Sequence, residues 1–120
     1  MINEDTIQKI WEKARIVSGY DSNYIRKDPC GAWILRNDYG NNKSLFGWEI
    51  DHVYPESAGG RDDWDNLRPL QWENNKSKGD DYPVYKVKVQ AEGSKNIYVD
   101  KQYIVSDELQ SILKTLYAIE

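Results

Sequence analysis

Two adjacent residues, Asp51 and His52, carry the side chains in this 120-residue sequence that are best suited to proton and metal chemistry. His52 is the only histidine, and an imidazole can take up a proton near neutral pH. The Asp51 carboxylate is a hard oxygen ligand of the kind that magnesium and manganese prefer, and the side-chain carbonyl of Asn74 or Asn75 could supply a second oxygen. Hydrolysis of a phosphodiester needs a base beside a water and a cation beside the developing negative charge. The residue types therefore favour metal-assisted hydrolysis as the chemistry of this stretch.

The segment that carries Asp51 and His52 has the pattern of a short strand. Its apolar and polar side chains alternate over residues 48–53, which would place Asp51 and His52 on opposite faces. Both side chains can reach one reaction centre only if the strand bends or ends there, and Pro55 favours an ending because proline cannot donate to a sheet ladder. We therefore predict that Asp51 and His52 converge with Asn75 on one small polar pocket.

A turn, a second strand and a short helix are predicted after this strand. The pair Gly59-Gly60 permits a wide turn, and residues 66–71 predict the returning strand, which Pro69 confines to a sheet edge. Residues 72–78 then predict two helical turns that end at Gly79.

The rest of the chain predicts a small α+β fold. Apolar residues spaced three and four apart predict an N-terminal amphipathic helix over residues 4–17, and residues 32–36 predict a short strand. A hairpin is predicted from residues 84–90 and 97–105, followed by a C-terminal helix that Ser106 caps.

The segment 46–80 resembles the ββα-metal motif of the HNH endonuclease family. That motif closes its first strand with Asp-His, continues through a Gly-Gly loop, opens its second strand with Asn-Leu, and places His or Asn followed by x-x-Lys on its helix. The matching residues here are Asp51-His52, Gly59-Gly60, Asn66-Leu67, Asn75 and Lys78. The spacings of 14 residues from His52 to Asn66 and 9 residues from Asn66 to Asn75 are similar to those of many family members. Four elements in order at fitting spacings make the resemblance specific.

The resemblance implies a DNA endonuclease built on a ββα-metal core. By it, His52 would activate the attacking water, and Asp51 and Asn75 would hold one divalent cation. Asn66 would clamp the loop so that His52 keeps its orientation. Asparagine in the third signature position makes this an HNN variant and favours Mg²⁺, with Mn²⁺ as the alternative, over zinc or nickel. The products would carry a 5′-phosphate and a 3′-hydroxyl.

The cysteine pairs that brace many family members with structural zinc have no counterpart here, because Cys30 is the only cysteine. We therefore expect no structural zinc and a buried Cys30. Packing by Trp48, Trp64 and Trp72, which flank the motif, would take the place of the metal.

Four basic residues in or beside the motif are candidate phosphate contacts: Lys78, Lys76, Arg61 and Arg68. The net charge of −4 argues against a protein that coats nucleic acid through a broad basic surface, but it is compatible with an enzyme that manages phosphates locally. Two alternatives stand beside the enzyme: a DNA-binding module that keeps the fold without catalysis, and a domain directed by a protein partner. The sequence leaves a protein partner or a homodimer open.

No apolar run approaches the length that crosses a bilayer, and the first residues lack the basic and apolar regions of a signal peptide. We expect a cytoplasmic protein with no membrane association. Its length and the absence of a long linker favour a single domain over residues 1–120.

Overall fold

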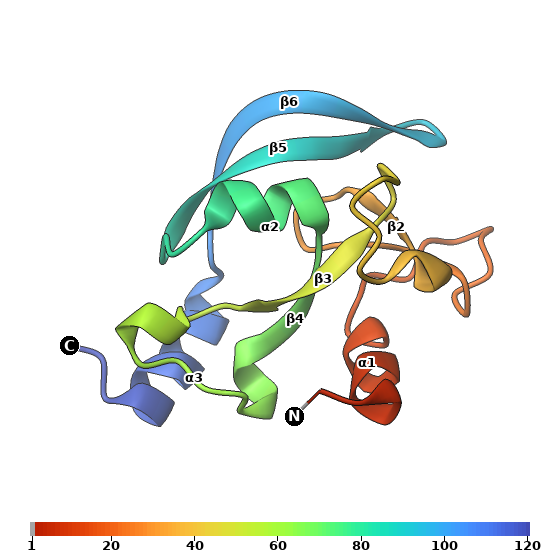
Figure 1. The fold of residues 1–120 in the computed structure, drawn as a ribbon. Helices are drawn as coiled ribbons and strands as arrows, with labels where there is room; N and C mark the ends of the chain where they lie inside the picture. The colour runs from red at the N-terminus through yellow and green to blue at the C-terminus, as the bar shows by residue number, and fades with distance from the viewer. Residues whose placement is uncertain (1) are drawn as a thin grey trace.

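Three α-helices and three two-stranded antiparallel sheets make up residues 2–120, the part of the chain that the computed structural model describes. In chain order they are α1 (Glu4–Trp11), β1 (Ile25–Lys27), β2 (Trp33–Leu35), β3 (Trp48–His52), β4 (Leu67–Gln71), α2 (Trp72–Lys78), β5 (Val84–Glu92), β6 (Lys95–Ile104) and α3 (Asp107–Tyr117). Figure 1 shows α2 between the β5–β6 hairpin and the β3–β4 hairpin, with α1 and α3 at the opposite end of the molecule from β5–β6. The predicted α+β class is confirmed.

The β3–β4 hairpin and α2 follow the predicted ββα order. β3 ends at His52, and Asp51 lies opposite Arg68 in the antiparallel register. β3 is the one strand that pairs with β4 among the described residues, so the other edge of β4 is left unpaired. Pro69 is compatible with that edge because it has no N–H to donate to a further strand.

A buried carboxylate, Asp28, joins the segment before the motif to α2. Its Oδ1 accepts hydrogen bonds from the backbone N–H groups of Cys30 and Ala32, both at 2.9 Å. Its Oδ2 accepts from the Gln71 N–H at 2.9 Å and from Asn74 Nδ2 at 3.2 Å. Burial raises the pKa of the Asp28 carboxyl, and the hydrogen bonds act in the opposite direction. The loop at residue 28 is thereby fixed to the start of α2.

The first helix is shorter than predicted. α1 ends at Trp11, because Arg15 exchanges two backbone hydrogen bonds with Lys27, at 2.8 and 3.0 Å, and these draw the chain into a β-bridge. At the other end, Asn3 caps the helix by accepting a hydrogen bond from the Thr6 N–H at 2.9 Å. Long-range strand pairing therefore outweighs helical periodicity in residues 12–17.

The β5–β6 hairpin covers α2 with the apolar face of β5. The side chains of β5 alternate between buried and exposed, and Lys86 and Lys88 lie on the exposed face. The pairing with β6 shifts by one residue between Val87 and Val89, which marks a β-bulge.

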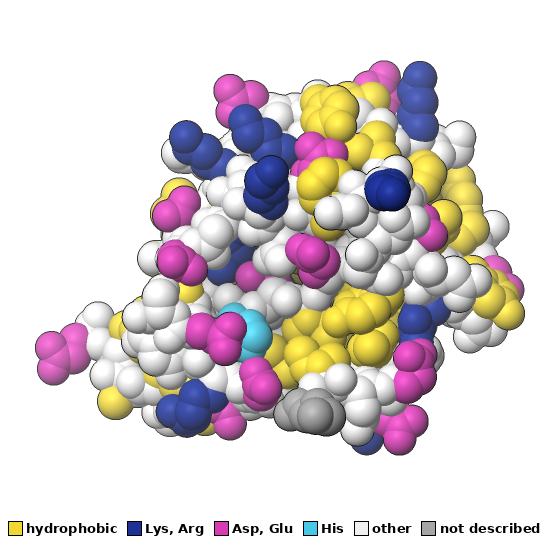
Figure 2. All heavy atoms as spheres, viewed as in Figure 1, with side chains coloured by type: hydrophobic (Ala, Val, Ile, Leu, Met, Phe, Trp, Pro, Cys, Tyr) yellow, Lys and Arg dark blue, Asp and Glu magenta, His cyan; other side chains and the backbone are white. Residues whose placement is uncertain are grey.

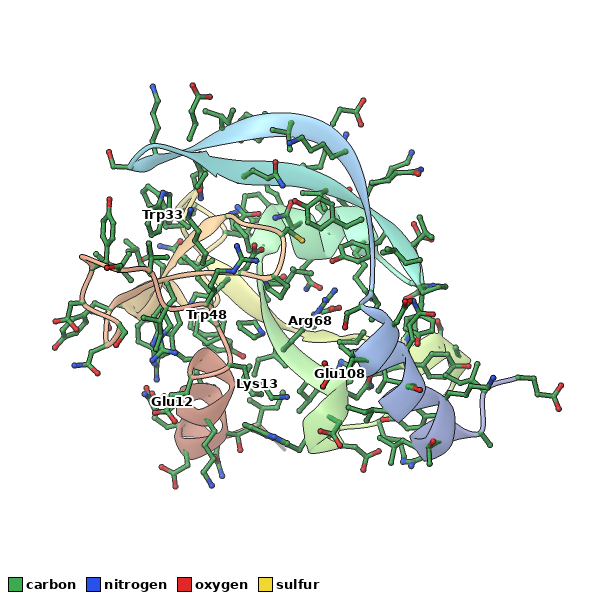
Figure 3. All side chains as sticks on the ribbon, turned by 180° about the vertical axis from the view of Figure 1, so that it is seen from behind. Glu12, Lys13, Trp33, Trp48, Arg68 and Glu108 are labelled. Atoms are coloured by element: carbon green, nitrogen blue, oxygen red, sulfur yellow. The ribbon has the colours of Figure 1, made fainter. Side chains whose placement is uncertain are left out.

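The three tryptophans that flank the motif are in different environments. Trp48 is fully buried, with its ring centroid 5.5 Å from that of Trp11, and Trp72 is half-buried and donates from Nε1 to the Ser44 carbonyl at 2.8 Å. Trp64 is 48% exposed, so the expectation that it packs in the interior is wrong. Figure 3 shows the Trp48 side chain above α1 in the view from behind. Cys30 is buried, as expected.

Within residues 2–120, none of the helices is long and apolar enough to cross a membrane.

Candidate active site

An open pocket lies where β3 ends, between the loop that follows β3 and the C-terminal end of α2. Its wall is made by Ile50, Asp51, His52, Pro55, Glu56, Asn75, Gly79 and Asp80. Figure 2 shows the histidine at the molecular surface with acidic side chains on several sides. Asp51, His52 and Asn75, the three residues that the sequence predicted to converge, are all among the residues that line this pocket.

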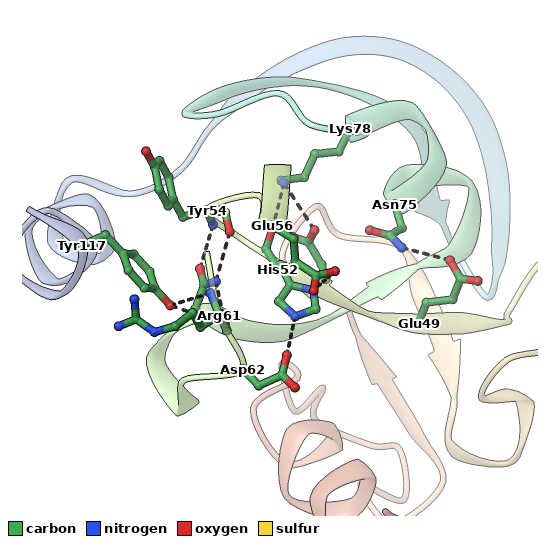
Figure 4. A network of polar contacts seen from close by, with 11 residues as sticks. Glu49, His52, Tyr54, Glu56, Arg61, Asp62, Asn75, Lys78 and Tyr117 are labelled. Carbon is green, nitrogen blue, oxygen red and sulfur yellow. Dashed lines mark hydrogen bonds and ion pairs between the residues drawn. The ribbon is translucent and has the colours of Figure 1, made fainter. Parts of the chain in front are cut away.

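The imidazole of His52 lies between two carboxylates. Its Nε2 is 2.7 Å from Asp62 Oδ1, and its Nδ1 is 3.7 Å from Glu56 Oε1 (Figure 4). The hydrogen bond with His52 lowers the pKa of Asp62. An ionised carboxylate can only accept, so a neutral His52 donates its Nε2–H to Asp62 and keeps Nδ1 as an acceptor.

Asp51 is buried and held by two cations. Its Oδ2 accepts a hydrogen bond from Arg68 Nε at 2.9 Å, and its Oδ1 is 3.3 Å from Lys78 Nζ. The side chains of Arg68 and Lys78 are 10% and 0% exposed, respectively. Burying one carboxylate requires compensating charge, and these two residues supply it.

The inward position of Arg68 and Lys78 corrects the expectation that they contact phosphates. Lys78 Nζ also donates to the His52 carbonyl at 3.2 Å, so its ammonium joins the end of α2 to the end of β3. Arg68 lies in the middle of the molecule, and its Nη2 finds no hydrogen-bond partner among the described residues (Figure 3). Neither cation is available to a ligand at the surface in this conformation.

Asn74 and Asn75, either of which the sequence offered as the second metal ligand, have different surroundings. Asn74 is fully buried, and its Oδ1 accepts from the N–H groups of Lys88 and Val89, both at 2.8 Å, while its Nδ2 donates to the Val89 carbonyl at 2.9 Å. Asn75 lines the pocket, and its Nδ2 donates to Glu49 Oε1 at 2.9 Å. Since a carboxylate only accepts, Glu49 fixes the amide of Asn75 with the NH₂ group toward itself and Oδ1 away from itself.

Asn66 holds both ends of the loop that follows β3. Its Oδ1 accepts from the Tyr54 N–H at 2.7 Å, and its Nδ2 donates to the carbonyls of Tyr54 and Arg61 at 3.0 and 3.1 Å. Gly60 allows this close packing, because a Cβ at that position would lie 1.8 Å from the Tyr54 carbonyl oxygen. The loop that starts directly after His52 is therefore held by a fully buried side chain.

Residues 39–81 match the family model described as HNH endonuclease. They form an HNH endonuclease domain. No curated protein and no solved structure gave a match to the chain. The match to this family suggests a nuclease that acts on DNA with a divalent metal.

The HNH domain begins upstream of the predicted motif, which started at residue 46. Tyr39, the first matched residue, forms a parallel bridge with Trp48, and its ring packs edge-on against the Trp48 ring with centroids 4.8 Å apart. The loop before β3 is thus part of the packing that supports the HNH domain.

Three acidic residues of the HNH domain were missed by sequence reasoning. Glu49 carried a signal, because it lies two residues before Asp51 and therefore on the same strand face. Glu56 and Asp62 carried none, because only the path of the loop brings them to the two ring nitrogens of His52.

The remaining two predicted phosphate contacts are exposed. Lys76 projects from the last turn of α2 into solvent. Arg61 is exposed as well, but its Nη2 is 3.3 Å from Asp63 Oδ2 and its guanidinium lies 4.8 Å from the ring centroid of Tyr117.

Two sets of side chains in the HNH domain offer ligands to a cation. Asp51 and Asn75 share a wall of the pocket; each Asp51 oxygen is engaged by one cation, which leaves further lone pairs, and Asn75 Oδ1 faces away from Glu49. These oxygens fit a hard divalent ion. His52, Glu56 and Asp62 also have ligand atoms within 4.8 Å of one another, but the two carboxylates face different ring nitrogens. In this structure the Asp62 carboxylate is engaged in a hydrogen bond with one ring nitrogen and Glu56 faces the other, so we assign the second set to hydrogen bonding.

Proposed function

We propose that this chain is a metal-dependent endonuclease that hydrolyses DNA phosphodiester bonds, with His52 as general base. The observation that carries the proposal is the pocket at the end of β3, where His52, Asp51 and Asn75 line one wall of an HNH domain. Asp51 and Asn75 would hold one divalent cation, Mg²⁺ in the first place and Mn²⁺ as the alternative.

His52 acts through Nδ1. With Nε2–H donated to Asp62, Nδ1 is the acceptor that takes a proton from water as its oxygen attacks phosphorus. The divalent cation supplies positive charge that stabilises the negative charge developing on the phosphate and the leaving oxygen. Asn66 keeps the loop after β3 in place, so it is a positioning residue for His52.

The fit of Mg²⁺ depends on how few protein oxygens the pocket provides. Asp51 and Asn75 would hold Mg²⁺ through two protein oxygens and would leave its remaining positions to water and a substrate phosphate, as Mg²⁺ prefers. Lys78 and Arg68 fix the orientation of the Asp51 carboxylate, so they support the site without contacting the substrate. Of the basic side chains considered, Lys76 and Arg61 are exposed and can contact the DNA backbone.

Cleavage of supercoiled plasmid tests the proposal directly. We expect nicked or linear DNA with Mg²⁺, none with excess chelator, and a loss of at least about 100-fold in rate for His52→Ala. Asn75→Ala should also lose metal-dependent cleavage, and its affinity for Mn²⁺, measured by titration calorimetry, should fall. If wild-type protein binds Mn²⁺ and plasmid but never cleaves the plasmid, the proposal that the chain is an endonuclease is refuted.

The acidic surroundings of the pocket favour a second candidate, a nuclease domain directed to DNA by a protein partner. Glu56 and Asp80 line the pocket beside Asp51, and the chain carries a net charge of −4. Repulsion between these groups and phosphates weakens binding of free DNA. Cleavage of plasmid by the isolated chain at physiological salt, with KM in the micromolar range or below, would remove the need for such a partner.

A further inference from the structure

We propose that Asp62 is a positioning residue that orients the His52 imidazole, and that α3 holds Asp62 in place through Tyr117. The catalytic consequence rests on the proposed function, in which His52 is the general base. The contact itself is independent of that function. Asp62 would fix Nε2 as the protonated nitrogen and leave Nδ1, which lies 3.7 Å from Glu56 Oε1, as the nitrogen that can accept a proton.

The distance between the two side chains is that of a charge-assisted hydrogen bond. Asp62 Oδ1 lies 2.7 Å from His52 Nε2, and the His52 side chain is 19% exposed. The Asp62 side chain is 54% exposed, so its own burial does not restrain it. The restraint must come from the backbone that carries Asp62.

That backbone is held on both sides of Asp62. On the preceding residue, the Arg61 carbonyl accepts from Asn66 Nδ2 at 3.1 Å, and the Arg61 N–H donates to the Tyr117 hydroxyl at 3.1 Å. On the following residue, Asp63 Oδ2 accepts from the Tyr117 hydroxyl at 2.9 Å. One phenol of α3 therefore contacts both neighbours of Asp62, and Figure 4 shows its contact with Arg61.

The ring of Tyr117 is held as well. It stacks on Tyr54 with ring centroids 5.4 Å apart, and the guanidinium of Arg61 covers it at 4.8 Å. Tyr54 is itself bonded through its backbone to Asn66. Since α3 lies outside the matched residues 39–81, this support for the base comes from a part of the chain beyond the HNH domain.

The proton transfer balances without moving a proton onto Asp62. The O–H bond of the attacking water breaks as an N–H bond forms at Nδ1, and His52 becomes an imidazolium. Asp62 remains ionised and stabilises the imidazolium through the Nε2–H hydrogen bond. Removing Asp62 therefore weakens the base and lets the ring rotate, while the exposed basic side chains Lys76 and Arg61 stay in place.

The single histidine makes the contact accessible to NMR. In metal-free protein labelled with ¹⁵N, the Nε2–H of His52 should give a hydrogen-bonded, downfield proton signal. Asp62→Ala should abolish that signal, whereas Asp100→Ala, which removes the same charge from an exposed position on β6, should leave it unchanged. A signal that survives in Asp62→Ala overturns the proposal.

The kinetic measurement separates positioning from DNA binding. Asp62→Ala should lower kcat by about 10- to 100-fold without raising KM for plasmid, and Asp62→Glu should recover part of kcat. Tyr117→Phe, which keeps the ring and removes the hydroxyl, should lower kcat by a smaller factor. Its matched control is Tyr54→Phe, whose hydroxyl makes no hydrogen bond within residues 2–120. A changed KM at constant kcat in Asp62→Ala would overturn the positioning role.

Two outcomes distinguish a failure of this inference from a failure of the proposed function. If wild-type protein does not cleave DNA but the Nε2–H signal still depends on Asp62, the proposed function fails and the contact stands. If wild-type and Asp62→Ala cleave equally fast, the inference fails and the proposed function stands. Addition of Zn²⁺ tests whether Asp62 instead binds a metal together with His52. If Zn²⁺ shifts the His52 signals and inhibits cleavage in wild type but does neither in Asp62→Ala, coordination replaces the hydrogen-bonding role and the proposal is overturned.

Discussion

At the scale of single residues, Asp51 has two roles. It is the interior counter-ion of Arg68 and Lys78, and in the proposed function it is also a ligand of the cation. The first role affects stability and the second affects activity, so a variant of Asp51 disturbs both. Asn75 lacks the first role, because its side chain is half-buried and makes one hydrogen bond, to Glu49.

Asp51→Ala should therefore lower the free energy of unfolding by about 3–5 kcal/mol, because it leaves two cations buried without their partner. Urea denaturation followed by tryptophan fluorescence measures the change. Replacing Glu73, a partly exposed acidic residue of α2 that accepts a hydrogen bond from Tyr98, should cost far less. Equal stability of Asp51→Ala and wild type would show that the two cations relax to solvent without penalty.

The thiol of Cys30 should be inert in the folded protein. Burial raises its pKa to about 12, and the nearby charge of Asp28 acts in the same direction. Ellman's reagent at pH 8 should find no reactive thiol in native protein and one after denaturation in guanidinium chloride. Rapid labelling of native protein would contradict the buried position.

The same raised pKa has a consequence for stability at alkaline pH. Between the ordinary value of 9.0 and about 12, the unfolded thiol loses its proton while the folded thiol keeps it. The contribution of Cys30 to stability is fully present below pH 9 and is lost as the pH rises toward 12. Cys30→Ala should flatten that part of the stability profile.

At the scale of elements, α2 presents neighbouring asparagines to two different structures. Asn74 ties α2 to β5 at the β-bulge, and Asn75 faces the pocket at the end of β3. The helical spacing of 100° per residue separates the two side chains, so adjacent residues of one type serve folding and, in the proposed function, chemistry.

The pair Asn74→Ala and Asn75→Ala should separate stability from activity. Asn74→Ala removes the partners of two backbone N–H groups and one carbonyl in β5, so we expect a loss of about 2–4 kcal/mol in the free energy of unfolding. Asn75→Ala should cost under about 1 kcal/mol and should abolish metal-dependent cleavage. Each variant is the control of the other, and the reverse pattern would exchange their roles.

At the scale of the whole molecule, the distribution of charge matters more than its sum. The chain has a net charge of −4, and acidic side chains lie next to the histidine on the face seen in Figure 2. Basic side chains gather on the same face over α2 and the β5–β6 hairpin. A DNA backbone that approached the pocket from that side would meet opposite charge before it met the acidic rim.

Lys76→Glu should therefore raise KM for plasmid and reduce the slope of log KM against log salt by roughly 1 for each phosphate that the protein no longer neutralises. Lys9→Glu is the matched control, because Lys9 is also exposed in the last turn of a helix but lies on α1, away from α2. Steady-state cleavage over a range of salt concentrations measures both. An equal effect of the two variants would mean that only net charge matters.

The sequence by itself determined the order of the strands, turn and helix around the candidate site. The alternation over residues 48–53, Pro55, the glycine pair and the helix that ends at Gly79 predicted the ββα order, and the spacing of Asp51-His52, Asn66 and Asn75 predicted the family. These features depend on neighbours in the chain, on backbone conformation and on side-chain periodicity, all of which are present in a one-dimensional pattern.

Only the tertiary structure decided which charges face solvent and which groups surround His52. Arg68 and Lys78 read as surface cations in the sequence, yet both turn inward to Asp51, because a buried carboxylate requires paired charge. Asp62 meets His52 only because Asn66, just before β4, and Tyr117, from α3, fold the intervening loop back. Such contacts join residues far apart in the chain, so no local pattern encodes them.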